Sequence, residues 1–158
     1  MFRSTLVAAL GLAAALSATV AAAGDAPLLT VVGPSGVQTY DLPALEAFPM
    51  AEFQTSTIWT KGSTRFQGVP LKTLLDAARI SQGSVVAKAI NDYAVEIPVA
   101  EVTADYPIVA YRMDGQVMSV RDKGPLWVIY PFDADPALQT EVTYSRSIWQ
   151  LDRLAAGQ

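Results

Sequence analysis

The chain contains neither cysteine nor histidine, and this absence limits its possible folds more than any other feature of the sequence. A disulfide framework and the common cysteine and histidine zinc sites both lose their required residues. A thiolate nucleophile and a Ser-His-Asp triad are excluded for the same reason. A packed hydrophobic core must therefore stabilise the fold, and a domain of this length is large enough to build one.

The first 23 residues have the order of segments that is typical of a secretory signal peptide. Arg3 precedes an apolar run from Leu6 to Val20, and small residues follow up to Ala23. We predict cleavage near Ala23 and a periplasmic or secreted protein in which residues 24–158 form a single domain. An N-terminal membrane anchor is the alternative, because the apolar run is almost long enough to span a bilayer.

The predicted mature chain is acidic. Cleavage removes one of the 11 Lys and Arg residues and none of the 15 Asp and Glu residues, which leaves a formal net charge of −5. The sequence also has no basic cluster, so we predict that the protein does not bind nucleic acid.

Short apolar and β-branched runs alternate with turn signals along the rest of the chain. Two runs surround the Gly-Pro-Ser-Gly of residues 33–36, two surround Asn91 and Asp92, and two surround Asp114 and Gly115, which indicates three β-hairpins. Helices are predicted to be few and short: one after Asp41 as N-cap, and one that follows a turn at residues 68–70. Strands outnumber helices in this pattern, which predicts a mixed α+β fold.

Four stretches carry a resemblance to a known family: "FQGVPLKTLL", "AINDYAVEIP", "VAYRMDGQVMSVRDKGPLWVIYPFD" and "SIWQLDRL". In order and approximate spacing they resemble the molybdopterin-binding domain of sulfite-oxidase-like oxidoreductases. The resemblance extends over residues 28–155 and is strongest for small, exported, single-domain members. It implies a mixed β-sheet domain with peripheral helices and a pterin cleft built from loops, and it makes molybdopterin a possible cofactor.

Catalytic members of that family hold molybdenum with a cysteine thiolate on the segment before the Gly-x-Pro-Leu motif. Here the corresponding position falls on Thr55 or Ser56, depending on whether it is counted from Trp59 or from Gly68. A neutral hydroxyl is a far poorer ligand than a thiolate for a redox metal. We therefore predict no metal site and no bound cofactor, and the resemblance alone leaves enzymatic activity open.

Several polar and aromatic residues are candidates for lining a cleft. The hydroxyl-rich segment, the two cationic loops and the Asn-Asp turn contribute Thr55, Ser56, Thr57, Trp59, Lys61, Arg65, Asn91, Asp92, Tyr93, Arg121 and Lys123. Each also has a purely structural interpretation, because threonine suits strands, Asn-Asp suits turns and surface lysines are ordinarily solvated. Trp127 and Trp149 are predicted to be core residues, with an aromatic wall that includes Tyr111 and Tyr130 as the alternative.

These observations lead to a hypothesis of an exported binding or sensory module that has lost molybdenum catalysis. Its partner is predicted to be a small anionic or polar ligand, or an envelope or membrane protein. The alternative is a molybdopterin-dependent oxidoreductase that acts on a small oxyanion or sulfoxide. A structural subunit of a membrane or heme protein is a third interpretation.

Overall fold

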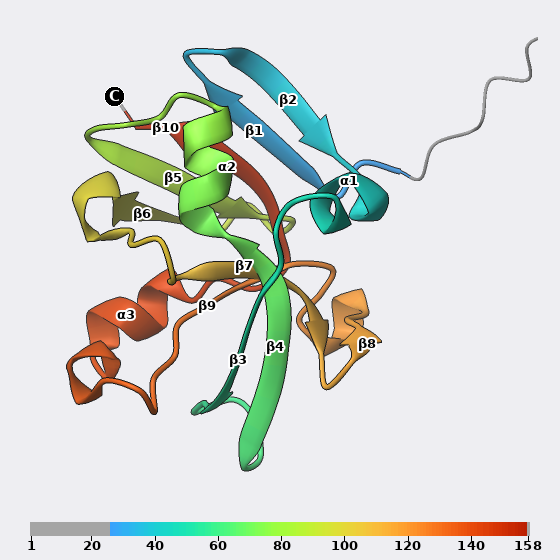
Figure 1. Cartoon of the computed structure of the whole chain (residues 1–158), viewed down its shortest axis with the longest axis vertical. Helices are drawn as coiled ribbons and strands as arrows, with labels where there is room; N and C mark the ends of the chain where they lie inside the picture. The colour runs from blue at the N-terminus through green and yellow to red at the C-terminus, as the bar shows by residue number, and fades with distance from the viewer. Residues whose placement is uncertain (1–25, 158) are drawn as a thin grey trace, which may run out of the picture.

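The computed structural model describes residues 26–157, which form two β-sheets and a few short helices (Figure 1). The predicted signal peptide, residues 1–23, lies outside the described residues. The first sheet has the strand order β2-β1-β10-β5-β6. Its strands are β1 (Leu29–Gly33), β2 (Gly36–Tyr40), β5 (Ser84–Ala89), β6 (Ala94–Pro98) and β10 (Leu151–Ala156). Strand β1 pairs in parallel with β10 and antiparallel with β2, so the sheet is mixed, as predicted.

The second sheet lies below the first in Figure 1 and has the order β3-β4-β7-β8, with β9 also paired to β7. Its strands are β3 (Ala51–Ser56), β4 (Ser63–Pro70), β7 (Ile108–Met113), β8 (Gln116–Val117) and β9 (Trp127–Ile129). All of its pairings are antiparallel. Strand β3 pairs only with β4, so β3 is an edge strand.

The helices are short and peripheral, as the sequence predicts. They are α1 (Leu42–Glu46), α2 (Leu71–Ala77), α3 (Glu141–Arg146) and the 3-10 turns η1 (Val99–Glu101), η2 (Val120–Asp122) and η3 (Pro136–Leu138). No helix within residues 26–157 is long and apolar enough to cross a membrane.

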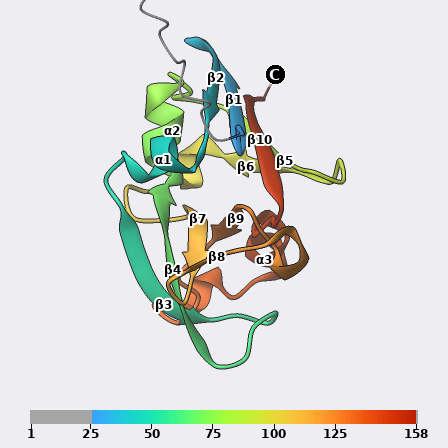
Figure 2. The same cartoon turned by 90° about the vertical axis from the view of Figure 1, so that its right-hand side faces the viewer.

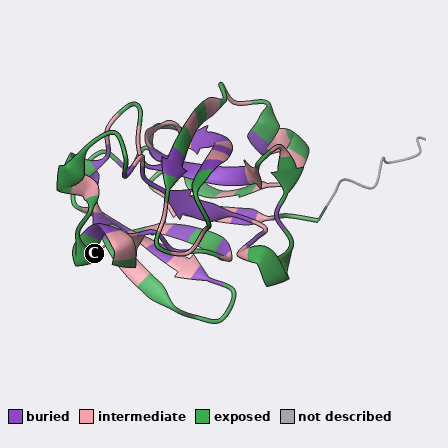
Figure 3. Cartoon of the chain, turned by 90° about the horizontal axis from the view of Figure 1, so that it is seen from below, coloured by how far each residue is buried: buried purple, intermediate pink, exposed green. Residues whose placement is uncertain are grey.

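The core lies between the strands and helix α2. Leu71, Leu74 and Leu75 of α2 are fully buried and pack with strand residues in one large apolar cluster. A smaller buried apolar cluster, which includes Phe66 and Trp127, packs on the second sheet. Figure 3 shows the buried residues concentrated in the strands, with the connecting turns exposed.

The three predicted hairpins and the helix after Asp41 are confirmed, whereas the turn predicted at Gly68–Pro70 is not observed. Asp114 and Gly115 have positive φ angles and join β7 to β8, and the Asp41 carboxylate accepts from Ala44 N at 2.8 Å as the N-cap of α1. The predicted turn at Gly68–Pro70 is wrong, because these residues complete strand β4 and pair with β7. Strand β4 shifts register between Gln67 and Gly68, and α2 then begins directly at Leu71.

Candidate functional site

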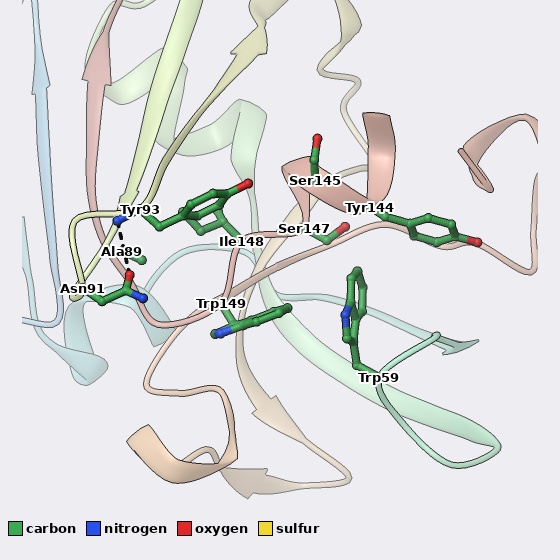
Figure 4. A pocket seen from close by; sticks show the side chains of 9 residues that line it. All are labelled: Trp59, Ala89, Asn91, Tyr93, Tyr144, Ser145, Ser147, Ile148 and Trp149. Carbon is green, nitrogen blue, oxygen red and sulfur yellow. Dashed lines mark hydrogen bonds between the residues drawn. The ribbon is translucent and has the colours of Figure 1, made fainter. Parts of the chain in front are cut away.

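A pocket of about 440 Å³ opens where three loop segments meet (Figure 4). We call it the Trp149 pocket; its lining residues are Trp59, Ala89, Asn91, Tyr93, Tyr144, Ser145, Ser147, Ile148 and Trp149. They come from the β3–β4 loop, from the end of β5 and the turn after it, and from α3 and the segment that joins α3 to β10. These segments are far apart in the sequence, so the pocket exists only in the folded chain.

Strand β9 positions the wall that carries Trp149. Val128 N donates to Ile148 O at 2.9 Å, and the buried indole Nε1 of Trp127 donates to Ser147 O at 3.0 Å. Residues 127 and 149 also form an isolated antiparallel bridge. The pocket wall is therefore attached to the core through both backbone and side-chain hydrogen bonds.

Aromatic rings form most of the pocket surface. The ring centroids of Trp59 and Trp149 are 5.6 Å apart, with an interplanar angle of 73°. Those of Trp59 and Tyr144 are 5.8 Å apart, with an interplanar angle of 90°. Thr57 Oγ1 accepts from Trp59 N at 3.1 Å, which fixes the backbone of the Trp59 loop. Trp149 is 38% exposed and Tyr93 is 52% exposed, so both rings offer free surface at the pocket mouth.

The polar groups of the lining are neutral. Asn91 Oδ1 accepts from Tyr93 N at 3.2 Å, which leaves the Asn91 amide NH₂ to donate elsewhere. Ser145 and Ser147 add hydroxyl groups, and no Lys, Arg, Asp or Glu is among the lining residues. A wall of rings with a few hydrogen-bonding groups can stack on a planar molecule and bond to polar atoms at its edge.

Lys123 is the cation that adjoins this pocket. Its Nζ lies 5.1 Å from the centroid of the Trp149 ring and 5.8 Å from that of Trp127, within cation–π range. The ammonium group therefore supports the Trp149 ring from outside the lining and adds positive potential near the pocket.

Asp92 is paired with a lysine. Its carboxylate forms an exposed ion pair with Lys88 at 2.8 Å, and the hydrogen bond and charge of Lys88 hold the pKa of Asp92 below its ordinary value. A carboxylate with a lowered pKa is a weaker base, so this geometry does not favour Asp92 as a general base.

Thr55 and Ser56, which correspond by the family resemblance to the metal-binding cysteine, are hydrogen-bonded to Asp133. The Thr55 side chain is fully buried, and its Oγ1 accepts from Asp133 N at 3.1 Å while donating to Ser56 O at 3.2 Å. Ser56 N donates to Asp133 Oδ2 at 2.6 Å. We call these contacts the Thr55–Asp133 clamp; they join the end of β3 to the loop after β9. Neither Thr55 nor Ser56 lines the Trp149 pocket.

We expect Thr55→Val to destabilise the fold by about 1–2 kcal/mol, because the Asp133 N–H loses its acceptor beside a buried side chain. Urea unfolding followed by circular dichroism measures the change. Ser56→Ala is the matched control and should stay within about 0.5 kcal/mol of the parent, since only the Ser56 backbone takes part in the clamp. Equal stability of Thr55→Val and the parent would show that the Thr55 hydroxyl contributes nothing to stability.

The other predicted cations are spread over the surface. Arg65 N donates to Asp114 Oδ1 at 2.9 Å, which places Arg65 beside the β7–β8 turn. Lys61 is exposed in the β3–β4 loop and Arg121 is exposed on η2. None of the three lines the Trp149 pocket, whereas the predicted candidates Trp59, Asn91 and Tyr93 do.

The prediction of a core position is confirmed for Trp127 and wrong for Trp149. Trp127 is fully buried, but Trp149 is 38% exposed, although the centroid of its ring lies 6.4 Å from that of Trp127. Sequence reasoning did not select Tyr144, Ser145, Ser147 or Asp133 at all. The "YSRSIW" stretch overlaps the resembling motif "SIWQLDRL" at residues 147–149, and this position was the available signal for the first three.

Comparisons with known proteins agree with this fold. Residues 40–133 match the model of a family described as "Oxidoreductase molybdopterin binding domain". The structure is similar to the crystal structure of the sulfane dehydrogenase SoxCD from Paracoccus pantotrophus, with a TM-score of 0.61 and 17% identity over 80% of this chain. The matched region is 37% of that chain. Comparison with curated protein sequences gives no match.

Proposed function

This chain belongs to the family of oxidoreductase molybdopterin-binding domains, and from that premise we propose that it is a ligand-binding module without molybdenum catalysis. Its ligand is a planar nitrogen heterocycle that binds, free of metal, in the Trp149 pocket. The observation that carries the proposal is the lining itself, in which exposed aromatic surface stands beside neutral hydrogen-bonding groups.

Thr55 and Ser56, which correspond to the metal-binding cysteine of catalytic relatives, do not fit a molybdenum centre. Thr55 is buried, and its hydroxyl already accepts one hydrogen bond and donates another within the Thr55–Asp133 clamp. Molybdenum in this family requires a soft ligand, and the whole sequence contains no cysteine. Within residues 26–157, no group of three or more Cys, His, Asp or Glu side chains could hold a metal ion.

The lining favours a neutral ring over a small anion. Trp59 and Trp149 supply faces and edges for stacking, and the free Asn91 amide donates to a ring nitrogen or carbonyl oxygen. A compact anion would find no cationic side chain among the lining residues, and Lys123, whose Nζ lies 5.1 Å from the centroid of the Trp149 ring, is not one of them. Export of the protein and an envelope partner stay predictions from the sequence.

The first test is metal and pterin analysis of the full chain purified from a host that makes molybdopterin. We expect substoichiometric molybdenum at background level. Stoichiometric molybdenum would overturn the proposal and would favour a molybdopterin-dependent oxidoreductase acting on a small oxyanion or sulfoxide.

The second test is fluorescence titration with hydroxymethylpterin, a neutral, metal-free planar probe. We expect a micromolar Kd for the parent and at least about tenfold weaker binding for Trp149→Ala, which loses about 1.4 kcal/mol or more of stacking. Val37→Ala is the matched control, because Val37 is an exposed apolar residue on β2 outside the pocket lining. Absence of binding at about 1 mM probe, or equal affinity of Trp149→Ala and the parent, would contradict the proposal.

A further inference from the structure

A second hollow, of about 580 Å³, runs beside the free edge of β3. We call it the β3 groove; it is lined by Pro49, Met50, Ala51, Glu52, Phe53, Pro70, Ala104, Asp105, Tyr106, Pro131 and Ala134. It shares no residue with the Trp149 pocket. Figure 2 shows β3 at the outer margin of the second sheet, where no other strand covers it.

The backbone of β3 presents free hydrogen-bonding groups to this groove. In an antiparallel pair, alternate residues direct both their N–H and C=O groups to the partner strand. Ser56 N bonds to Asp133 instead of to β4, so Ser56, Gln54 and Glu52 face away from β4. The N–H groups of Glu52 and Gln54 therefore point away from β4, and within residues 26–157 no carbonyl outside the strand ladders accepts a hydrogen bond from them. An edge of this kind is a template for one additional strand.

The Thr55–Asp133 clamp limits how far such a strand can extend. The Asp133 carboxylate already occupies the N–H of Ser56, which is the last outward-facing donor of β3. Only the outward positions at Glu52 and Gln54 remain available. A short segment is therefore the occupant that the edge can accept.

The groove is acidic and apolar. Glu52 and Asp105 are its charged lining residues, and the lining contains no Lys or Arg. Gln67 Nε2 donates to Glu52 Oε2 at 2.7 Å, which orients this carboxylate without neutralising it. Met50 is 54% exposed and offers apolar surface beside the edge. Charge complementarity therefore favours a segment in which basic and apolar residues alternate.

We propose that the β3 groove binds a short, extended, basic segment of a partner protein by strand addition. Its backbone pairs with Glu52 and Gln54, and its cationic side chains face Glu52 and Asp105. Its apolar side chains, which lie on the opposite face of the added strand, contact Phe53. This is the β-augmentation mode of peptide recognition. A second copy of this chain is a poorer occupant, because pairing two β3 edges would gather four carboxylates at one interface without a cation from either groove.

The test uses a synthetic peptide of six residues, with alternating lysine and valine and with blocked ends, titrated onto the full chain. We expect a Kd of roughly 10–100 μM that weakens as salt is added, since few backbone hydrogen bonds and two ion pairs are available. Hydrogen exchange at the Glu52 and Gln54 amides should slow when the peptide is bound. A matched peptide with glutamate in place of lysine should bind at least about tenfold more weakly.

Gln54→Pro removes the outward-facing N–H and leaves the β4 ladder intact, because proline is tolerated at a solvent-facing edge position. We expect it to weaken peptide binding at least about tenfold, whereas Gln54→Ala, which keeps the N–H, should bind like the parent. Trp149→Ala should also bind the peptide like the parent. Failure of the strand-addition proposal is therefore distinguishable from failure of the heterocycle proposal.

Three results would overturn the proposal. They are no binding of the lysine peptide at about 1 mM, equal affinity for the lysine and glutamate peptides, and unchanged affinity of Gln54→Pro despite a native circular dichroism spectrum. Self-association of the parent that Gln54→Pro abolishes would assign the groove to a second copy instead. Analytical ultracentrifugation over a concentration series detects that outcome.

Discussion

Trp127→Ala is expected to destabilise the fold by about 3–5 kcal/mol, the loss associated with removing a large aromatic side chain from a packed core. Trp127 is fully buried, and its ring centroid lies 5.5 Å from that of Phe66 and 5.8 Å from that of Trp59. The substitution also leaves the Ser147 carbonyl without the indole donor that reaches it at 3.0 Å. Denaturant unfolding followed by far-ultraviolet circular dichroism measures the loss.

Two variants separate the causes of that loss. Trp127→Phe keeps most of the ring volume but removes the indole N–H, so it should cost about 1–2 kcal/mol. Trp149→Ala removes a ring that is 38% exposed and should cost less than Trp127→Ala. A stability loss at Trp149 equal to that at Trp127 would contradict the assignment of Trp127 as the buried support of the pocket wall.

The same residue connects stability to binding. Trp127 holds Ser147 through its indole and bridges to Trp149 through its backbone, so the pocket wall is an extension of the core. The aromatic surface of Trp149 at the pocket mouth is therefore held by packing beneath it. Rigid support of this kind lowers the entropy that a ligand must overcome to stack there.

Local features of the fold were predictable from the sequence. Asp114 and Gly115 adopt the positive φ angles that a two-residue hairpin needs, and Asp41 caps α1 through a side chain three residues from its donor. Such signals act over a few residues, so one sequence is enough to find them. The family resemblance supplied the mixed-sheet class, which the structure confirms.

The site was less predictable, because it depends on contacts between distant segments. Asp133 lies 78 positions from Thr55, and no local sequence signal indicates that its backbone and carboxylate would bond to Thr55 and Ser56. The exposure of Trp149 also depends on a contact between distant segments, because the segment after α3 crosses β9. Periodicity and propensity describe one element at a time and carry no information on these crossings.

Gly68 was predicted as part of a turn, and its actual position explains why the residue is glycine. It lies in β4 opposite Ala110 of β7, at the register shift that follows Gln67. A Cβ on Gly68 would lie 2.6 Å from Ala110 Cα and closer still to the Val109 carbonyl oxygen. The requirement comes from the close approach of a neighbouring backbone, because Gly68 has no positive φ angle.

Gly68→Ala is therefore expected to cost about 3 kcal/mol or more, at the upper end of the range for overpacking. The atoms that meet the new methyl group belong to the backbone of β7, so no change of side-chain rotamer can relieve the clash. Relief requires β4 and β7 to separate, which weakens the pairing that holds the centre of the second sheet. Thermal and urea unfolding of the purified variant, or its soluble yield if it does not fold, measure the effect. Gln67→Ala is the neighbouring control and should cost under about 1 kcal/mol, because Gln67 is only half-buried and loses two exposed side-chain hydrogen bonds, to Glu52 and Met50. A Gly68→Ala variant as stable as Gln67→Ala would mean that β4 and β7 tolerate a wider separation than their packing indicates.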